Sequence, residues 1–406
     1  MGNKNIKKKD NNSNTSSNTK TFKKAKDLKT SIIYCLGQVK YKDNYYASIG
    51  LSGGKIEVYD TNNLDLVANY NELKYVTPQY IHYLHDDTFI LTGSRVYIFI
   101  IYKNKNFTNK DDKNSLSKLK YNIEMIQEIK YPLQSNIGYY WTNFLKSFIF
   151  DRNLYKKNDI LSFSDIYEKS DENQSINSKE EELIIDCNKG ILIFKRNEEN
   201  NKDKNEEDDF DIDNYLKNWE NNPYIYKQNL SSIYNYDIEQ VNYKYIAGVD
   251  DNYALLYSME EYELITKFEV KISQHCYKIM FMLTDDILAI GGDDTITLIS
   301  IKNFEISLIS TIKPNYKITE ICILPNYNII IGIQNKDKNI KREEFLYQYQ
   351  YCPTVNKSTK KLEHNIYQIS TELLTNNNSN ITFESLNNSL IAIVDQRYIL
   401  SYDIQS

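Results

Sequence analysis

The hydrophobic residues of this chain recur in one short pattern: an alternating apolar run, a tight polar turn and a second alternating run. The first copy consists of Tyr45–Gly50, a turn at Ser52–Gly54, and Lys55–Asp60. Two alternating runs joined by a few turn residues predict a β-hairpin. The further copies lie at Thr88–Tyr102, Glu182–Lys195, Lys244–Met259, Ile287–Ile301, Asn328–Tyr351 (with an insertion) and Ser389–Ile404, so the chain predicts seven hairpins.

The turns of these hairpins hold residues that suit a tight reversal of the backbone. Glycine reaches positive φ without steric cost, and an aspartate side chain can bond to nearby backbone. Two carboxylates in one turn fall short of the oxygen ligands that calcium needs, so the turns predict no metal site. We expect structural turn roles for Gly53, Gly54, Asp250, Asp251, Asp293, Asp294 and Asp395.

Further strand-like runs before and after the hairpins raise each repeating unit to four strands. Clean units are spaced 41 residues apart from Lys55 to Val96 and 42 apart from Tyr253 to Thr295. Units of this length that bury their faces on one another predict an all-β fold, a seven-bladed β-propeller of four-stranded antiparallel blades. Eight blades are the alternative, because the apolar run Asn136–Phe150 also fits extra strands of the third blade, a helix or an eighth blade.

Glycine recurs at one equivalent place, towards the end of the second strand of a unit. A glycine weakens a strand, so its recurrence there predicts a close approach of backbone where neighbouring blades converge. The positions are Gly50, Gly93, Gly248, Gly291 and Gly332, five of the 12 glycines in the chain.

The repeating units resemble the WD-repeat propeller family over residues 22–406. The Trp-Asp pair of that family is replaced by Tyr59–Asp60 and Tyr402–Asp403, and elsewhere by Phe194–Lys195 or Ser300–Ile301. The Gly-His dipeptide of the family is absent, and turn aspartates comparable to the family's stand in three units. Blade stability is therefore expected to depend on apolar packing between neighbours.

The resemblance also implies how the ring closes. The last predicted strand would leave an open sheet edge, and such an edge favours aggregation. In the WD-repeat family the N-terminal strand completes the last blade, and residues 21–29 are placed to do the same here.

Two regions follow from this arrangement: a disordered basic tail over residues 1–20 and a propeller over residues 21–406. The tail holds one aliphatic residue after the initiator, Ile6, which is too little apolar surface to offset the entropy of ordering. Within the propeller we expect loop insertions at residues 103–120, 135–178, 198–213 and 354–364.

Charge is unevenly distributed along the chain. The whole chain carries −6 and residues 1–29 carry +7, so the remainder carries −13. An acidic body repels phosphates, so we expect no nucleic-acid partner. The basic tail and the acidic insertion at residues 198–213 are expected to be solvated, with a fold-back between them or a basic partner as alternatives.

The compartment is expected to be the cytoplasm. No apolar run approaches the roughly 20 residues that a transmembrane helix needs, and no secretory signal begins the sequence. The five cysteines are scattered and lack CxxC spacing, which argues against both a disulfide framework and a zinc site.

Candidate catalytic chemistry is sparse. The four histidines, His82, His85, His275 and His364, stand in no catalytic or metal-binding motif. The glycine pairs Gly53–Gly54 and Gly291–Gly292 lack the following helix and Lys-Ser/Thr of a phosphate-binding loop. We therefore predict no catalytic, cofactor or metal residues and no cofactor.

The N-terminus carries one candidate functional motif. Gly2 with Lys7, Lys8 and Lys9 resembles an N-myristoylation signal with a polybasic neighbour, which together anchor a protein to a membrane. The usual Ser or Thr at the sixth position is Ile6, so a plain basic tail is the alternative.

These features favour a non-catalytic protein–protein interaction scaffold that belongs to a multi-protein complex. The partners are expected to bind at loops, where binding residues concentrate. One alternative is a membrane-associated adaptor that uses residues 1–9. The second alternative is a propeller hydrolase, which would need convergent histidines and carboxylates on the innermost strands. Three innermost runs are instead mostly apolar: Ser31–Val39, Cys276–Leu283 and Ile318–Leu324.

Overall fold

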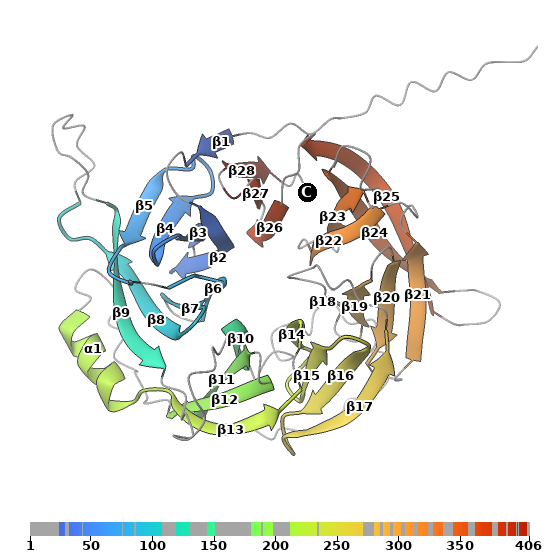
Figure 1. Cartoon of the computed structure of the whole chain (residues 1–406), viewed down its shortest axis with the longest axis horizontal. Helices are drawn as coiled ribbons and strands as arrows, with labels where there is room; N and C mark the ends of the chain where they lie inside the picture. Colours follow the sequence, from blue (N-terminus) through green and yellow to red (C-terminus); the bar gives the residue numbers. More distant parts are fainter. Residues whose placement is uncertain are drawn as a thin grey trace, which may run out of the picture.

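The computed structural model of the chain describes residues 24–28, 32–42, 44–74, 76–84, 87–107, 119–129, 144–150, 180–187, 190–197, 212–233, 235–270, 280–284, 287–292, 295–301, 305–311, 316–323, 328–335, 344–355, 362–375, 381–386, 389–394, 396 and 398–403. Within these ranges the chain forms 28 β-strands and one α-helix. The sheets follow one another around a common axis, so the fold is a β-propeller (Figure 1).

Each sheet unit is a group of four antiparallel strands, ordered from the ring centre outwards. The first unit holds β2 (Ile33–Tyr41), β3 (Asn44–Leu51), β4 (Lys55–Asp60) and β5 (Leu66–Tyr70). The second holds β6 (Tyr80–Tyr83), β7 (Thr88–Thr92), β8 (Val96–Lys103) and β9 (Tyr121–Ile129). The third holds β10 (Phe144–Phe150), β11 (Glu180–Cys187), β12 (Gly190–Asn197) and β13 (Ile225–Ser231).

The remaining units repeat the same order. The fourth unit holds β14 (Asp237–Gln240), β15 (Tyr245–Val249), β16 (Tyr253–Ser258) and β17 (Glu263–Glu269). The fifth holds β18 (Met280–Thr284), β19 (Ile287–Gly291), β20 (Thr295–Ser300) and β21 (Glu305–Thr311). The sixth holds β22 (Tyr316–Ile323), β23 (Asn328–Asn335), β24 (Glu344–Val355) and β25 (Leu362–Thr375). The seventh holds β26 (Ile381–Leu386), β27 (Ser389–Val394), β28 (Tyr398–Asp403) and β1 (Lys24–Asp27).

All seven predicted hairpins are present as antiparallel pairs, from β3 with β4 to β27 with β28. The N-terminal strand closes the ring as predicted, because β1 pairs with β28 from Lys24 opposite Ser401 to Asp27 opposite Tyr398. The count of seven blades, with eight as the alternative, stays a prediction. Residues 130–143 and 151–179, which decide it, lie outside the described residues.

The first and second units join into one eight-stranded sheet. The joint is a parallel pairing of β2 with β6, in which Gln38 lies opposite His82. Gly37 permits this approach, since a Cβ added there would clash with the carbonyl oxygen of Ile81. The same reason applies to Gly50, one of the five recurring glycines, where an added Cβ would overlap Pro78 of the segment before β6.

The predicted insertions differ from the observed elements in three places. The range 198–213 ends in an unpredicted helix, α1 (Ile212–Asn221), and residues 198–211 lie outside the described part. The range 135–178 includes β10, the innermost strand of the third unit, which was one of the options weighed. The range 354–364 overlaps the ends of β24 and β25, and β25 itself was not predicted.

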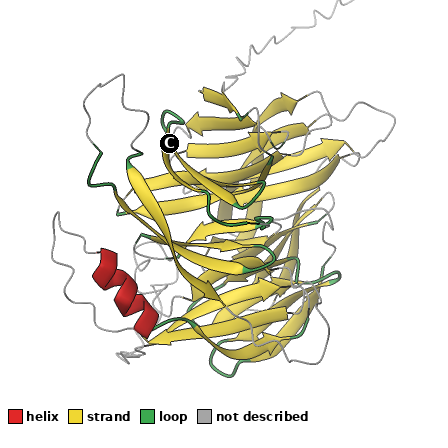
Figure 2. Ribbon diagram, turned by 60° about the vertical axis from the view of Figure 1, so that its left-hand side comes forward, coloured by secondary structure: helices red, strands yellow, loops and turns green. Residues whose placement is uncertain are grey.

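The core lies between neighbouring sheets. One buried cluster extends from Val241 in the fourth unit to Ile321 on β22, and another joins the second and third units through Ile98 and Phe194. Figure 2 shows the sheets side by side, with α1 outside them. Apolar packing between units therefore holds the ring together, as the repeat pattern predicts.

Candidate interaction surface

The predicted turn residues lie in separate units and do not converge on one site. Gly53 and Gly54 form the turn between β3 and β4, each with φ at +79°. The Asp250 side chain accepts the backbone N–H groups of Asn252 and Tyr253, both at 2.8 Å. Asp251 accepts a hydrogen bond from the Tyr236 hydroxyl at 2.6 Å.

Several predicted residues lie outside the described part of the chain. They are Gly2, Lys7, Lys8, Lys9, Asp293, Asp294, Asp395, His85 and His275. His364 lies on β25, and His82 lies on β6 against the rings of Tyr80 and Tyr83. The described residues contain no cluster of His, Cys, Asp and Glu able to hold a metal ion.

Two cysteine thiols are shielded from solvent. Cys35 and Cys187 are both buried and free. Burial raises the pKa of Cys35 to about 12, so its thiol stays protonated at neutral pH.

The inner strands of the third and fourth units hold a charged network that the sequence analysis missed. Lys146 on β10 lies 3.0 Å from Asp237 and 2.8 Å from Glu239, both on β14. The second carboxylate oxygen of Asp237 accepts the Met280 backbone N–H on β18 at 3.0 Å. Burial alone lowers the pKa of Lys146, but the two carboxylates outweigh burial and hold it well above its usual value.

This network joins three successive units through one buried carboxylate. Lys146 is 14% exposed and Asp237 is fully buried, so neither charge is available to attack or bind a substrate from solvent. The innermost strands β10 and β14 lie outside the runs that were expected to be apolar, and the charges on them pair with one another. Their arrangement suits structural cross-linking of the ring.

A second buried carboxyl lies at the same junction. Asp186 is the residue before the last of β11, and neither of its carboxyl oxygens has a hydrogen-bond partner within the described residues. The Asn235 amide oxygen, just before β14, also lacks a partner there. Burial raises the pKa of Asp186 well above its usual value, and the charge of Asp237 acts in the same direction.

The outer half of this junction is held by a tyrosine clasp, made of Glu182, Lys195, Lys227 and Tyr262. The Tyr262 hydroxyl donates to Glu182 at 2.5 Å and accepts from Lys227 at 2.9 Å. Glu182 is nearly fully buried and also lies 3.2 Å from Lys195. Tyr262 has φ at +59°, a left-handed conformation that costs a tyrosine free energy and persists where surrounding contacts hold it.

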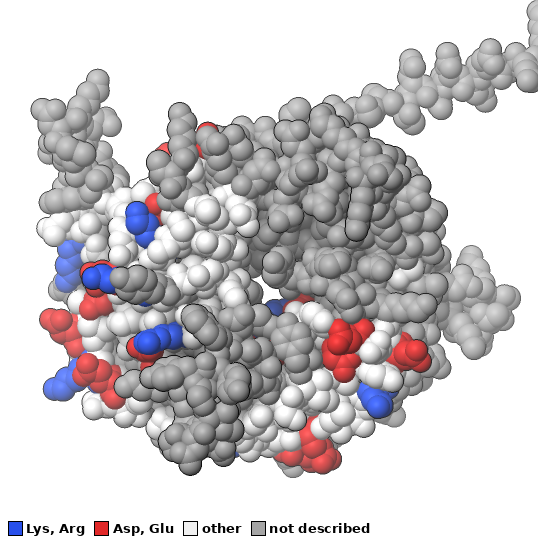
Figure 3. Space-filling view, viewed as in Figure 1, with Lys and Arg blue, Asp and Glu red and all other residues white. Residues whose placement is uncertain are grey.

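An exposed apolar patch flanks the tyrosine clasp on the outer strands. We call it the outer patch and define it as Ile225 on β13 with Leu264 and Ile265 on β17. Their exposed fractions are 66%, 40% and 41%. Figure 3 shows acidic side chains gathering over the part of the ring formed by β15–β17, whereas acidic and basic groups are mixed near β5 and β9.

The neighbouring junction, between the second and third units, is covered by α1. Trp219 of α1 is buried and donates its indole N–H to the Gln127 side chain of β9 at 3.1 Å. Gln127 also bonds both backbone groups of Tyr224, at 3.1 and 2.9 Å. Arg196 of β12 lies over the Trp219 ring, 3.6 Å from its centroid, and the Tyr224 hydroxyl donates to Glu181 of β11.

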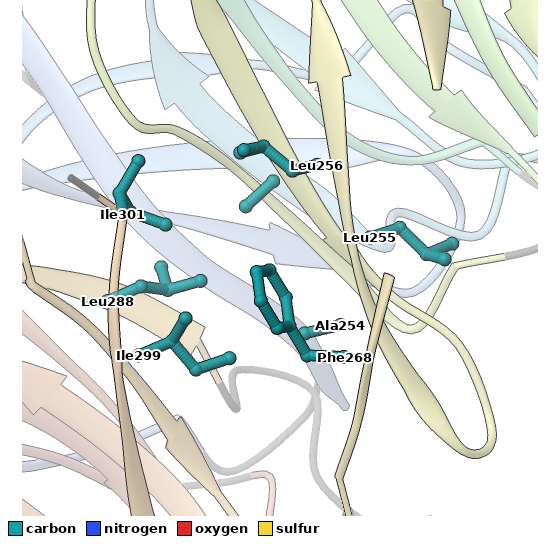
Figure 4. A pocket seen from close by; sticks show the side chains of 8 residues that line it. Ala254, Leu255, Leu256, Phe268, Leu288, Ile299 and Ile301 are labelled. Atoms are coloured by element: carbon teal, nitrogen blue, oxygen red, sulfur yellow. The ribbon is translucent and has the colours of Figure 1, made fainter. Parts of the chain in front are cut away.

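A small apolar cavity between the fourth and fifth units offers no ligand chemistry. It has no room for a water-sized molecule and is lined by aliphatic side chains and Phe268, including Leu256, Leu288 and Ile299 (Figure 4). Small-molecule sites need a few convergent polar groups to orient a ligand, and this lining supplies none. The cavity is a packing gap between two sheets.

The comparisons with known proteins identify the fold. No protein-family model and no curated relative matches the sequence. The crystal structure of BBS1N in complex with ARL6DN, soaked with lead, contains a chain with TM-score 0.54 and 10% identity, over 96% of this chain and 98% of that one. A chain of the mitotic checkpoint complex crystal structure gives the same TM-score and identity, over 95% of each chain.

At 10% identity these similarities show the architecture, and they place the chain among proteins built on a β-propeller. A search of the described residues for a membrane-crossing helix found none of sufficient length and hydropathy.

Proposed function

We propose that the protein is a non-catalytic scaffold that holds other proteins on a WD-repeat-like propeller. The solved chains of similar fold come from assemblies: BBS1N is in complex with ARL6DN, and the second chain belongs to the mitotic checkpoint complex. Fold alone does not define function, so the proposal depends on the surface of this chain.

One observation carries the proposal: an exposed apolar patch is fixed beside a rigid, cross-linked junction. Ile225, Leu264 and Ile265 expose large aliphatic side chains on adjacent outer strands. Exposed apolar groups that cluster mark interaction sites, whereas single ones are ordinary on protein surfaces. The charged groups of the inner strands β10 and β14 pair with one another, so they support cross-linking of the ring better than catalysis.

The scaffold is tested by its size in the cell. We expect the native protein to elute from a size-exclusion column, in a fresh lysate, well above the 47.9 kDa of the chain. The purified recombinant chain is expected near its own mass. Elution of the native protein at the mass of a single chain, as for the purified recombinant chain, would contradict the proposal.

We place this scaffold in the cytoplasm, with membrane attachment through residues 1–9 as a second candidate. Gly2 and the lysines that follow it favour the second candidate, because a lipid chain and a basic patch together give stable attachment. Vesicle flotation of the full-length protein and of a Gly2→Ala variant separates the two. Equal soluble partition of both proteins would exclude lipid anchoring.

A further inference from the structure

The outer patch is presented on two strands whose relative position is fixed. Lys227 and Tyr262 join β13 to the start of β17, and Ile225 and Leu264 lie two residues from them. Lys227 also lies 4.1 Å from the centroid of the Tyr262 ring, which adds a cation–π contact to the hydrogen bond. A patch held in this way loses little conformational entropy when it is covered.

β17 also offers backbone hydrogen-bonding groups at the outer patch. It pairs with β16 on one side and has no partner strand on the other among the described residues. Every second residue of such an edge directs its N–H and C=O away from the sheet, where an extended segment can pair with them. The pairing with β16 shifts register between Leu256 and Tyr257, which leaves Ile265 as the extra residue of a bulge.

The charges around β17 select the kind of segment that fits. Glu260, Glu261, Glu263 and Glu269 are all exposed along the turn and strand. Lys267 is the basic residue of β17, and its ammonium group lies 4.8 Å from the centroid of the Tyr253 ring. Glu260 lies 3.7 Å from Lys244, and Glu261, Glu263 and Glu269 outnumber Lys267 around Leu264 and Ile265, which complements a cationic partner.

We infer that β17 and the outer patch bind an extended segment of another protein in which apolar and basic residues alternate. The segment adds a strand to the free edge of β17, and its apolar side chains cover Leu264, Ile265 and Ile225. Its basic side chains lie on the other face, the face of Glu263. This inference rests on the proposed scaffold function and names the chemistry of its partner.

The probe is a fluorescein-labelled peptide of alternating valine and lysine, seven residues long to match β17. Its binding to the full-length protein is followed by fluorescence anisotropy. We expect Leu264→Ser combined with Ile265→Ser to weaken binding about tenfold or more, because two apolar anchors are lost without any change in charge. Tyr262→Phe, which removes the hydroxyl of the tyrosine clasp and keeps the ring, is expected to weaken binding by a smaller factor.

Met125→Ser is the matched control variant. Met125 is 38% exposed on the outer strand β9, close to the exposure of Leu264 and Ile265, and lies away from the outer patch. This variant should bind the peptide as the unaltered protein does. Two control peptides separate the contributions: one with glutamate in place of lysine, and one methylated on alternate backbone amides, and both should bind about tenfold more weakly.

Two outcomes would overturn the inference. The first is equal binding of the valine–lysine peptide by the Leu264→Ser/Ile265→Ser variant and the unaltered protein, which would leave only non-specific charge attraction. The second is a dimer of the purified chain by light scattering that the same double variant abolishes, which would make a second copy the occupant. Neither outcome removes the excess of the native size over the size of the purified chain, so failure of the inference is distinguishable from failure of the proposed function.

Discussion

The third unit of the ring has two neighbours and meets them in opposite ways. Its junction with the second unit is covered by α1 and filled by Trp219, and Gln127 satisfies the polar groups there. Its junction with the fourth unit also has an apolar core, but it holds the charged groups of Lys146, Asp237 and Asp186 near the ring centre and is open outside at the outer patch.

The difference indicates which junction is for stability and which is available for partners. An edge that is covered by its own chain needs no other protection from aggregation. A sheet edge that stays open is exposed to non-specific pairing with strands of other chains. Charged residues on the edge strand β17, such as Glu263, Lys267 and Glu269, disfavour that pairing. The charges thus discourage random contacts and favour a partner of matching charge.

The largest expected effect comes from breaking the covered junction with Trp219→Ala. The indole is buried against Arg196 and Tyr215 and bonds Gln127, so its removal leaves a large cavity and an unfilled acceptor. We expect a loss of about 3–5 kcal/mol in the free energy of unfolding, measured by urea denaturation. Glu220→Ala on the exposed face of the same helix should stay within about 0.5 kcal/mol. A loss for Trp219→Ala as small as the loss for Glu220→Ala would show that α1 does not stabilise the ring.

The hairpins of the fold could be predicted from the sequence, whereas the helix and the outer strand next to the covered junction could not. Hairpins were predictable because tight turns and alternating strands leave a local signature, and all seven formed as antiparallel pairs. The outer strand β13 was missed because Ile225–Ser231 is a largely exposed edge without a continuous apolar face. Helix α1 was missed because its ten residues follow directly on an acidic run.

The candidate surface was less predictable than the fold. Lys146 and Asp237 are 91 residues apart, and only the closed ring brings them together. Alternating charges in Asp237–Gln240 were the one local signal that this inner strand differs from its apolar neighbours. The outer patch depends on Ile225 and Leu264 standing on adjacent edges, which no local pattern encodes.

The second largest expected effect on the free energy of unfolding concerns Gln127. It separates the packing of Trp219 from the hydrogen bonds of Gln127 at the junction that α1 covers. Gln127→Ala leaves the Trp219 ring in place but removes the acceptor of two N–H groups and the donor to the Tyr224 carbonyl. We expect a loss of about 1–3 kcal/mol in unfolding free energy, since buried polar groups are left without partners. Gln127→Glu, which keeps the acceptors and loses the donor, should lie between the two proteins. No loss in Gln127→Ala would mean that packing of Trp219 alone holds α1.

The third prediction concerns how the free energy of unfolding depends on pH through Asp186, at the junction of the third and fourth units. The folded-state pKa of Asp186 is raised, so the folded protein keeps a proton that the unfolded chain releases above about pH 4. The contribution of Asp186 to stability is therefore complete below that pH and is lost as pH rises through the folded-state pKa, with a slope of at most about 1.4 kcal/mol per pH unit.

Asp186→Asn, which cannot ionise, should flatten this dependence when unfolding free energy is measured between pH 5 and pH 8. Lys146, Asp237 and Tyr257 face the same group, and the raised pKa values of Lys146 and Tyr257 keep their own titration above this window. An unchanged pH dependence in the variant would assign the loss of stability to other groups.

The smallest expected effect comes from the open edge. Leu264→Ser combined with Ile265→Ser removes two aliphatic side chains that the folded ring buries only in part, so unfolding free energy should change by no more than about 0.5 kcal/mol. Circular dichroism during urea unfolding measures this, with the unaltered protein as reference. A loss comparable to that of Trp219→Ala would mean that the outer patch is part of the core, and the contrast between the two junctions would disappear. A variant that keeps its stability but binds the valine–lysine peptide more weakly would show that Leu264 and Ile265 contribute to binding and not to folding. Its fold is intact, so the lost affinity comes from the two exposed side chains alone.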